Sequence, residues 1–313
     1  MANTQTKVRI KSTYMKKSLG DKVFDIFNIL LFALLSFSFI YPFINVVVVS
    51  LNDPYDAMKG GLYFWPRVFS VDHYTQVLTD PKIYTGYAVT VARTVVGAVT
   101  HMFCTSIFAY GLSKKNLLFR KTYTVIGIIP MFFGGGLIPT YILLRSLNLL
   151  NTFWVYIIPG LIGMWNAMIF KTFYLGIPSS LEEAAKIDGC SDFGVFFKII
   201  LPLAKPCIAA ILLFKGVEHW NAWFDAYIYV TDDALMPLQT VLMRIINQSG
   251  AAQDAAKAMQ MNVVYSGDET KSAITPESIR YATMVVSIGP IVLIYPFLQK
   301  YFEKGVMIGS VKE

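Results

Sequence analysis

The longest uncharged stretch of the chain, Ile26–Leu51, decides what kind of protein this sequence can form. As an α-helix rising about 1.5 Å per residue it reaches roughly 39 Å, more than the hydrocarbon core of a bilayer, which is about 30 Å thick. The stretch is also too long for a cleaved signal peptide, whose apolar core has only about 7–15 residues. It therefore predicts a retained membrane-spanning helix.

Composition extends this interpretation to the rest of the chain. Of its 313 residues, 55% are hydrophobic and only 15% are charged, whereas a soluble domain is about one quarter charged. Five further apolar stretches are long enough to span a bilayer, and these are Ile83–Ser113, Thr122–Leu144, Ser146–Phe170, Pro206–Val230 and Tyr281–Gln299. We therefore expect an all-α integral membrane protein with six transmembrane helices, and not a large soluble enzyme.

Basic residues are distributed unequally between the segments that join these stretches. The N-terminal tail, the 113–121 link, the 171–205 segment and the C-terminal tail together hold 17 Lys and Arg, against 8 in the alternate loops. Loops rich in Lys and Arg stay in the cytoplasm, so we expect both termini there. The net charge of +7 then reflects topology and not nucleic-acid binding, because no basic helix or aromatic-basic module is present.

This topology divides the chain into three parts. A cytoplasmic basic tail covers residues 1–22, the six-helix transmembrane domain covers 23–303, and a cytoplasmic C-terminal tail covers 304–313. Within the transmembrane domain, we expect a cytoplasmic loop at 176–206 and a long external loop at 231–280.

Glycine and proline interrupt the third apolar stretch. Gly134–Gly136 lies between Pro130 and Pro139, and such residues break or bend helices. A phosphate-binding loop would need Lys followed by Ser or Thr after the last glycine, and Leu137 and Ile138 stand there instead. We therefore expect a bent span, or a short loop that dips into the membrane and lines protein or water.

The 176–206 loop contains a predicted short helix, residues 180–188. Ser179 and Ser180 each precede a Glu by three residues, which is the spacing of a capping box, and Gly189 suits the position that ends a helix. Helical spacing places four residues on one shallow face: Leu181, Ala184, Ala185 and Asp188. From the residues alone, this segment is either an ordinary surface helix or one that presses into a groove of another protein.

The same loop carries a recognisable motif. Glu183-Ala184-Ala185, then Gly189, then Ile199 and Leu201-Pro202 follow one another at the spacing of the EAA signature. The chain thus resembles the permeases of ABC importers. Other segments resemble the carbohydrate-uptake branch, above all permeases of the lipoprotein/polysaccharide type, and these are Gly135–Tyr141, Trp220–Phe224, Met236–Thr240 and Lys304–Lys312. The terminal Glu313 departs from that pattern, which has Gly there.

The resemblance implies the type I ABC importer permease fold in a bacterial cell (plasma or inner) membrane, and a translocation subunit without catalytic residues. The implied partners are a second homologous permease, two ABC ATPase subunits, an extracellular or periplasmic solute-binding protein and an oligosaccharide. ATP and Mg would be bound by the ATPase subunits, so no cofactor is expected in this chain. The residues implied to couple to the ATPase are Glu182, Glu183, Ala184, Ala185, Asp188, Gly189, Leu201 and Pro202.

Ionisable residues interrupt the fifth apolar stretch at Lys215, Glu218, His219 and Asp225. Each costs about 2.5–3.5 kcal/mol at the bilayer centre, so such residues face the bundle or a cavity. Two interpretations stay open. The cluster is either a structural network that joins spans or subunits, or it lines the solute pathway, in which case the candidate residues are Glu218, Trp220, Asn221 and Trp223. Arg93 in the second stretch indicates a structural or gating ion pair.

Other classes of function are less compatible with the sequence. His73, His101 and His219 lack metal-binding spacing, and neither an HExxH nor a GxSxG motif is present, which disfavours an integral-membrane enzyme and a metal site. A stand-alone secondary transporter would need no docking loop for an ATPase. A permease for a non-sugar solute is the nearer alternative.

Overall fold

The computed structural model describes residues 18–248, 277–290 and 292. This part of the chain is all-helical, with no β-strand beyond an isolated antiparallel bridge between Asn52 and Phe69. Two of its helices are long and apolar enough to cross a membrane, and the number of spans rises to five if each of three bent helix pairs counts as one. The all-α fold class is confirmed, whereas the count of six spans stays a prediction. The tails at 1–17 and 304–313, and most of the external loop, lie outside the described residues.

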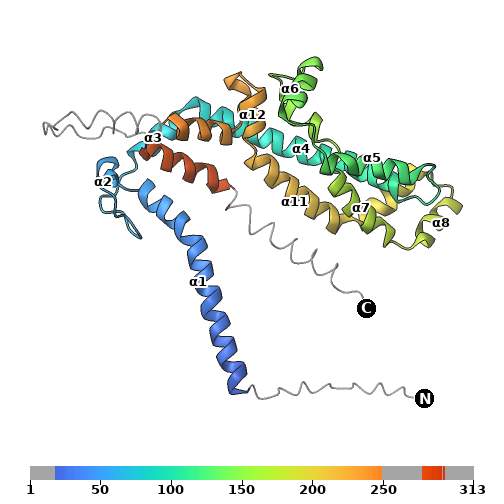
Figure 1. Cartoon of the computed structure of the whole chain (residues 1–313), viewed down its shortest axis with the longest axis horizontal. Helices are drawn as coiled ribbons and strands as arrows, with labels where there is room; N and C mark the ends of the chain where they lie inside the picture. The colour runs from blue at the N-terminus through green and yellow to red at the C-terminus, as the bar shows by residue number, and fades with distance from the viewer. Residues whose placement is uncertain (1–17, 249–276, 291, 293–313) are drawn as a thin grey trace, which may run out of the picture.

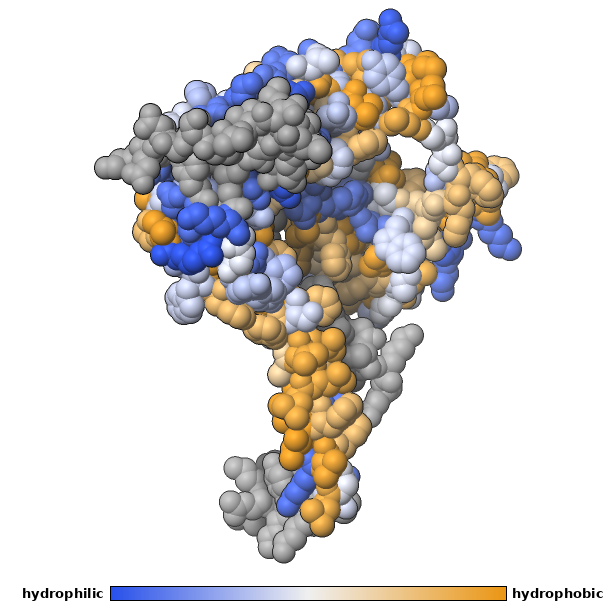
Figure 2. All heavy atoms as spheres, turned by 60° about the vertical axis from the view of Figure 1, so that its left-hand side comes forward, coloured by the Kyte–Doolittle hydropathy of each residue, from blue (hydrophilic) through white to orange (hydrophobic). Residues whose placement is uncertain are grey.

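The first spanning helix, α1 (Leu19–Ser50), runs away from the other helices (Figure 1). It begins with a capping box in which the Ser18 hydroxyl accepts from Gly20 and the Asp21 carboxylate accepts from the Ser18 N–H at 2.9 Å. Val48 and Ser50 are its buried residues, and Figure 2 shows the rest as a largely apolar column. A helix that is apolar all round needs lipid or another protein against it.

Short helices and turns close the end of the bundle where α1 finishes. These are α2 (Pro54–Met58) and α3 (Asp72–Thr79). The Ser50 hydroxyl lies 2.6 Å from the Tyr74 hydroxyl, which joins α1 to α3. Hydrogen bonds from Asn52 and Arg67 hold the pKa of Asp56 below its usual range. The Asp56 carboxylate therefore stays ionised and connects Asn52 to Arg67.

The second spanning helix, α4 (Pro81–Ser113), is the centre of the bundle and packs against α7 (Met164–Leu175) and α11 (Lys205–Asn221) (Figure 1). A Cβ at Gly97 would lie 2.4 Å from Nε2 of His219. Only glycine therefore lets the His219 imidazole lie against the backbone of α4. This contact fixes how closely α11 approaches α4.

The third apolar stretch is broken where the glycines predict a break. It forms α5 (Arg120–Phe132) and α6 (Leu137–Ser146), which are inclined by 118° to each other. Gly136 takes a φ of +86°, a conformation that disfavours residues with a side chain. The expectation of a bent span or dipping loop is confirmed.

The apolar stretch Ser146–Phe170 does not form one continuous helix. After α6 the chain forms two short 3₁₀ turns, Phe153–Tyr156 and Ile158–Gly160, and α7 begins only at Met164. Asn148 and Asn151 have φ values of +54° and +55°, and Asn is among the few residues that tolerate this left-handed conformation. The segment is apolar enough for a membrane, but its backbone turns repeatedly.

The remaining described helices follow α7 along the chain. They are α8 (Ser179–Ile187), α9 (Asp192–Val195), a π turn (Phe196–Ile200), α10 (Leu201–Leu203), α12 (Phe224–Tyr229), a 3₁₀ turn (Asp233–Leu235) and helices at 238–248 and 277–290. The 238–248 helix lies within the segment expected as a long external loop, 231–280. Of the predicted sixth stretch, Tyr281–Gln299, the structure describes residues 281–290 and 292.

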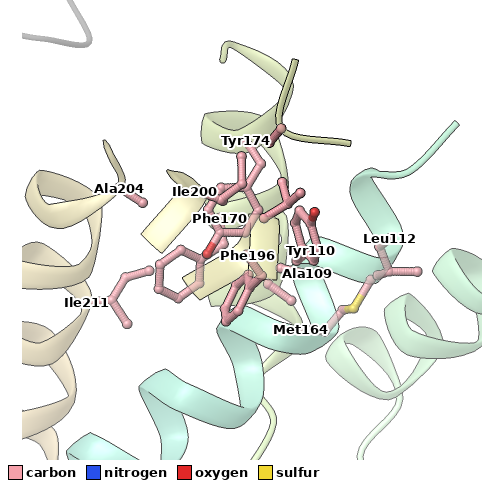
Figure 3. Close-up of a cluster of buried hydrophobic side chains, with 13 residues drawn as sticks. Ala109, Tyr110, Leu112, Met164, Phe170, Tyr174, Phe196, Ile200, Ala204 and Ile211 are labelled. Atoms are coloured by element: carbon pink, nitrogen blue, oxygen red, sulfur yellow. The ribbon is translucent and has the colours of Figure 1, made fainter. Parts of the chain in front are cut away.

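A buried cluster ties the helices of one end of the bundle together (Figure 3). Phe170 and Tyr174 of α7 meet Phe196 and Ile200 of the π turn, and Tyr110 of α4 completes the contact. The 176–206 loop is therefore packed on the bundle, and we refer to this group as the α4–α7 core cluster.

Candidate functional site

The loop helix α8 lies close to where the sequence predicts it, but it begins differently. Its N-cap residue is Pro178, and no side chain caps it. The predicted capping box at Ser179 and Ser180 is therefore absent. The carboxylate of Glu182, which such a box would use, forms an ion pair with Lys114, the residue that follows α4.

The end of α8 agrees with the prediction. Gly189 has a φ of +81°, the Gly189 N–H donates to the Lys186 carbonyl at 3.0 Å, and the Cys190 N–H donates to the Ala185 carbonyl at 2.9 Å. These bonds form the Schellman arrangement that ends helices at glycine. The chain then turns directly into α9, whose first turn is capped by the Ser191 hydroxyl.

The predicted shallow face of α8 is divided in two by the structure. Ala185 is only 7% exposed and belongs to the α4–α7 core cluster, so its small side chain lets α8 approach its own subunit. Ala184 and Asp188 are exposed, and Leu181 is 43% exposed. The outward surface also contains Ile187, which is 86% exposed and which no motif indicates.

Charged side chains hold α8 on the bundle. The Lys114 ammonium, paired with Glu182, also lies 3.9 Å from the centre of the Tyr110 ring. Lys186 Nζ lies 2.8 Å from Asp192 Oδ1, and this hydrogen bond raises the pKa of Lys186. Glu182 is thus engaged within the chain.

Of the other residues that the motif implies to couple to the ATPase, some are exposed and one is packed on the bundle. Glu183 is exposed and has no ion pair among the described residues. Leu201 packs against the α4–α7 core cluster, and Pro202 is exposed.

A second polar site surrounds a break in the fifth apolar stretch. α11 ends at Asn221 and α12 begins at Phe224, although no Gly or Pro stands between them. Carbonyl groups freed by a break inside a membrane need partners from the protein. Arg93 Nη1 donates to the Ala222 carbonyl at 3.2 Å, and the Thr240 hydroxyl donates to the Trp223 carbonyl at 3.0 Å.

Arg93 also forms the ion pair that its position predicts. Its Nη2 lies 2.5 Å from Asp225 Oδ2, and its Nη1 lies 3.2 Å from Asp225 Oδ1. The guanidinium carbon lies 4.3 Å from the centre of the Tyr156 ring, within the range of a cation–π contact. Arg93 is 1% exposed, so this bidentate pair joins α4 to the start of α12 deep in the bundle.

The four candidate pathway residues do not share one environment. Glu218 and Asn221 are exposed, and Glu218 pairs with Lys215 at 2.7 Å. Trp220 is 8% exposed, its ring centre lies 6.5 Å from that of Tyr87, and its indole N–H has no acceptor among the described residues. Trp223 is half-buried beside Phe224 and Tyr227.

No group of His, Cys, Asp or Glu in the described part of the chain is arranged to hold a metal ion. The polar groups gather instead at a broken helix within an apolar bundle. This arrangement is typical of membrane transport proteins, in which interrupted helices carry polar backbone and ionisable side chains to the membrane interior.

The chain belongs to the family of binding-protein-dependent transport system inner membrane components, whose model matches residues 10–308. It is therefore a membrane-embedded transport subunit.

Known proteins share this sequence over nearly its whole length. The chain is 40% identical to the polygalacturonan/rhamnogalacturonan transport system permease protein YtcP of Bacillus subtilis, with 95% of this chain and 100% of that protein covered. It is 38% identical to protein LplC of the same organism, with 95% and 98% covered. A chain in the crystal structure of a bacterial ABC transporter involved in import of the acidic polysaccharide alginate is 30% identical, with a TM-score of 0.82 and with 92% of this chain and 99% of that chain covered.

Proposed function

We propose that this chain is the transmembrane permease subunit of an ATP-driven ABC importer for oligosaccharides or polysaccharide fragments. The observation that carries the proposal is the full-length similarity to a permease named for polygalacturonan and rhamnogalacturonan transport. The fold similarity to a transporter that imports alginate supports the same class of substrate.

In this proposal the chain pairs with a second homologous permease, and two ABC ATPases bind on the cytoplasmic side. The ATPases hold ATP and Mg, so this chain carries no cofactor. A solute-binding protein outside the cell delivers the sugar, which agrees with the description of the family.

The exposed side of α8 is the proposed contact with the ATPase. Glu183, Ala184 and Ile187 offer a carboxylate, a small residue and an apolar residue to a partner. Glu182 and Ala185 face the subunit itself. A movement of α8 caused by the ATPase is then transmitted to the α4–α7 core cluster.

The test of this function is reconstitution of the complex that co-purifies with the tagged chain. We expect ATP hydrolysis to rise when a loaded binding protein presents oligosaccharides, for example short galacturonans. Stimulation by amino acids or metal ions alone would support the non-sugar alternative. Uptake that needs no ATPase would support a secondary transporter and overturn the proposal.

Substitution of the two alanines of α8 distinguishes a residue of the proposed docking surface from a residue of the subunit's core. Ala184→Trp should leave the subunit folded but weaken ATPase binding, because overfilling a tight contact commonly costs 1–3 kcal/mol. Ala185→Trp should instead lower the unfolding temperature of the isolated chain, because Ala185 is buried. Retention of ATPase on washing and thermal unfolding measure the two effects. If both variants lowered stability equally and bound ATPase equally, this division would be wrong.

Membrane orientation is tested by labelling with an impermeant thiol reagent. In a background with Cys104, Cys190 and Cys207 changed to Ser, we expect Thr231→Cys to react in intact cells. Asn116→Cys, in the basic link after α4, should react only after permeabilisation. Both positions are exposed. The reverse pattern would invert the proposed topology, with both termini then outside the cytoplasm.

Trp223 is the pathway candidate that is partly accessible, and Trp223→Ala tests the pathway interpretation. If sugar rings stack on the indole, we expect the transport rate to fall about tenfold, which corresponds to the loss of a contact worth about 1.4 kcal/mol. The matched control is Trp220→Phe, which keeps the buried contact with Tyr87. Unchanged rate and sugar preference in a normally assembled Trp223→Ala complex would favour the structural network.

A further inference from the structure

A basic cavity of about 790 Å³ lies between the link after α4, the first turns of α5 and the end of α7. Four cations line it: Lys115, Arg120, Lys121 and Lys171. No acidic residue lies in its wall. Its other wall residues include the apolar Phe119 and Val125, which are 74% and 55% exposed.

The cations of this cavity have few partners within the chain. Arg120 Nε donates to the Leu112 carbonyl at 2.9 Å. In the part of the chain that the structure describes, no ion pair involves Lys115, Lys121 or Lys171. The neighbouring Lys114 differs, since Glu182 neutralises it. Several positive charges therefore converge on one cavity without a counter-charge.

A second, apolar cavity of about 360 Å³ lies between the same two helices. Gly127, Pro130 and Met131 of α5 and Met164 of α7 line it. Gly127 follows Thr124 of the basic cavity by one helical turn, and Met164 precedes Lys171 by two. α5 itself has no buried residue, so its side chains are open to the surroundings of the subunit.

We propose that these two cavities bind one anionic phospholipid of the cytoplasmic leaflet, the headgroup phosphate among the four cations and an acyl chain along the apolar cavity. Basic pockets between spanning helices on the cytoplasmic side take anionic lipid headgroups. A free phosphate would use the basic cavity alone, whereas the apolar extension fits a molecule with a hydrocarbon chain. The proposal rests on the proposed orientation, which puts the link after α4 in the cytoplasm.

The test measures lipid retention by the full chain with native mass spectrometry. Phosphatidylglycerol, phosphatidylcholine and water-soluble glycerol phosphate are the probes, and Lys121→Gln/Lys171→Gln is the cavity variant. Lys198→Gln/Lys205→Gln is the control, because it removes the same charge from exposed residues outside the cavity. We expect the wild type and the control to retain phosphatidylglycerol in preference to phosphatidylcholine. The cavity variant should bind phosphatidylglycerol about thirtyfold more weakly, at about 1 kcal/mol for each lysine.

Each contrary outcome overturns the proposal in a recognisable way. Equal weakening in the cavity variant and the control would mean that surface charge, and not the cavity, holds the lipid. Full competition by glycerol phosphate would identify a site for soluble anions. Absence of phosphatidylglycerol from the wild type would exclude the site altogether. Lys121→Arg/Lys171→Arg should restore binding, which separates loss of charge from loss of folding.

Discussion

Replacing Asp225 by alanine is expected to destabilise the folded chain by about 3 kcal/mol. Removing one member of a buried ion pair commonly costs 3–5 kcal/mol, because the other charge is left without compensation. We expect the lower end of that range, since the Asp225 side chain is 29% exposed whereas that of Arg93 is 1% exposed. Thermal and denaturant unfolding of the purified chain in detergent measures the loss.

Two further variants show whether the pair itself is responsible. Arg93→Leu/Asp225→Leu should be less destabilised than Asp225→Ala, because no unpaired charge is left in the bundle. Arg93→Lys should be intermediate, since Lys keeps the charge but lacks the planar fork that serves both Asp225 and the Ala222 carbonyl. Equal stability of Asp225→Ala and wild type would show that water already screens this pair.

Replacing Gly189 by valine is expected to reduce substrate-stimulated ATP hydrolysis of the assembled importer about tenfold. At a φ of +81°, a residue with a side chain is strained by roughly 1–2 kcal/mol, and a β-branched one most of all. We expect the variant to relieve that strain by opening the turn between α8 and α9. A strain of about 1.4 kcal/mol shifts the equilibrium between the closed and the open turn tenfold. Insertion into the membrane should be unchanged, because Gly189 lies in a loop outside the spans.

Asparagine at the same position is the matched control. No atom lies within 4 Å of a Cβ built at Gly189, so crowding does not distinguish the variants and only the backbone conformation does. Gly189→Asn should retain most of the stimulation, because Asn tolerates the left-handed region. If valine and asparagine behaved alike, backbone strain would not be the cause. Normal stimulation with valine would sink the assignment of α8 as the element that contacts the ATPase.

Hydropathy and local turn residues predict part of this fold because they act over short distances. The uncharged run at Ile26–Leu51 forms a long helix, and Gly134–Gly136 breaks the third stretch as expected. Hydropathy reports the environment of a segment and not its backbone geometry, however. For that reason the apolar residues after Ser146 suggest a helix, whereas Asn148 and Asn151 turn the chain.

The features that sequence patterns do not indicate depend on distant residues. The break at Ala222 is stabilised by Arg93 and Thr240, which come from other elements. Glu182 pairs with Lys114, the residue that follows α4, and does not cap α8. Such contacts are set by tertiary packing, so neither is visible in the spacing of residues along α8 or α11.

If α8 contacts the ATPase as proposed, α11 would act as a lever arm, because it is attached at both of its ends. Near its first residue, Ala204 and Ile211 belong to the same core cluster as Ala185 of α8, and at its last turn Arg93 holds the Ala222 carbonyl. The helix is about 25 Å long at 1.5 Å per residue. A tilt of about 10° at the α8 end would therefore displace the break by roughly 4 Å over that length. In the proposed orientation, small rotations at the α8 end would in this way become side-chain-sized movements beside Trp223.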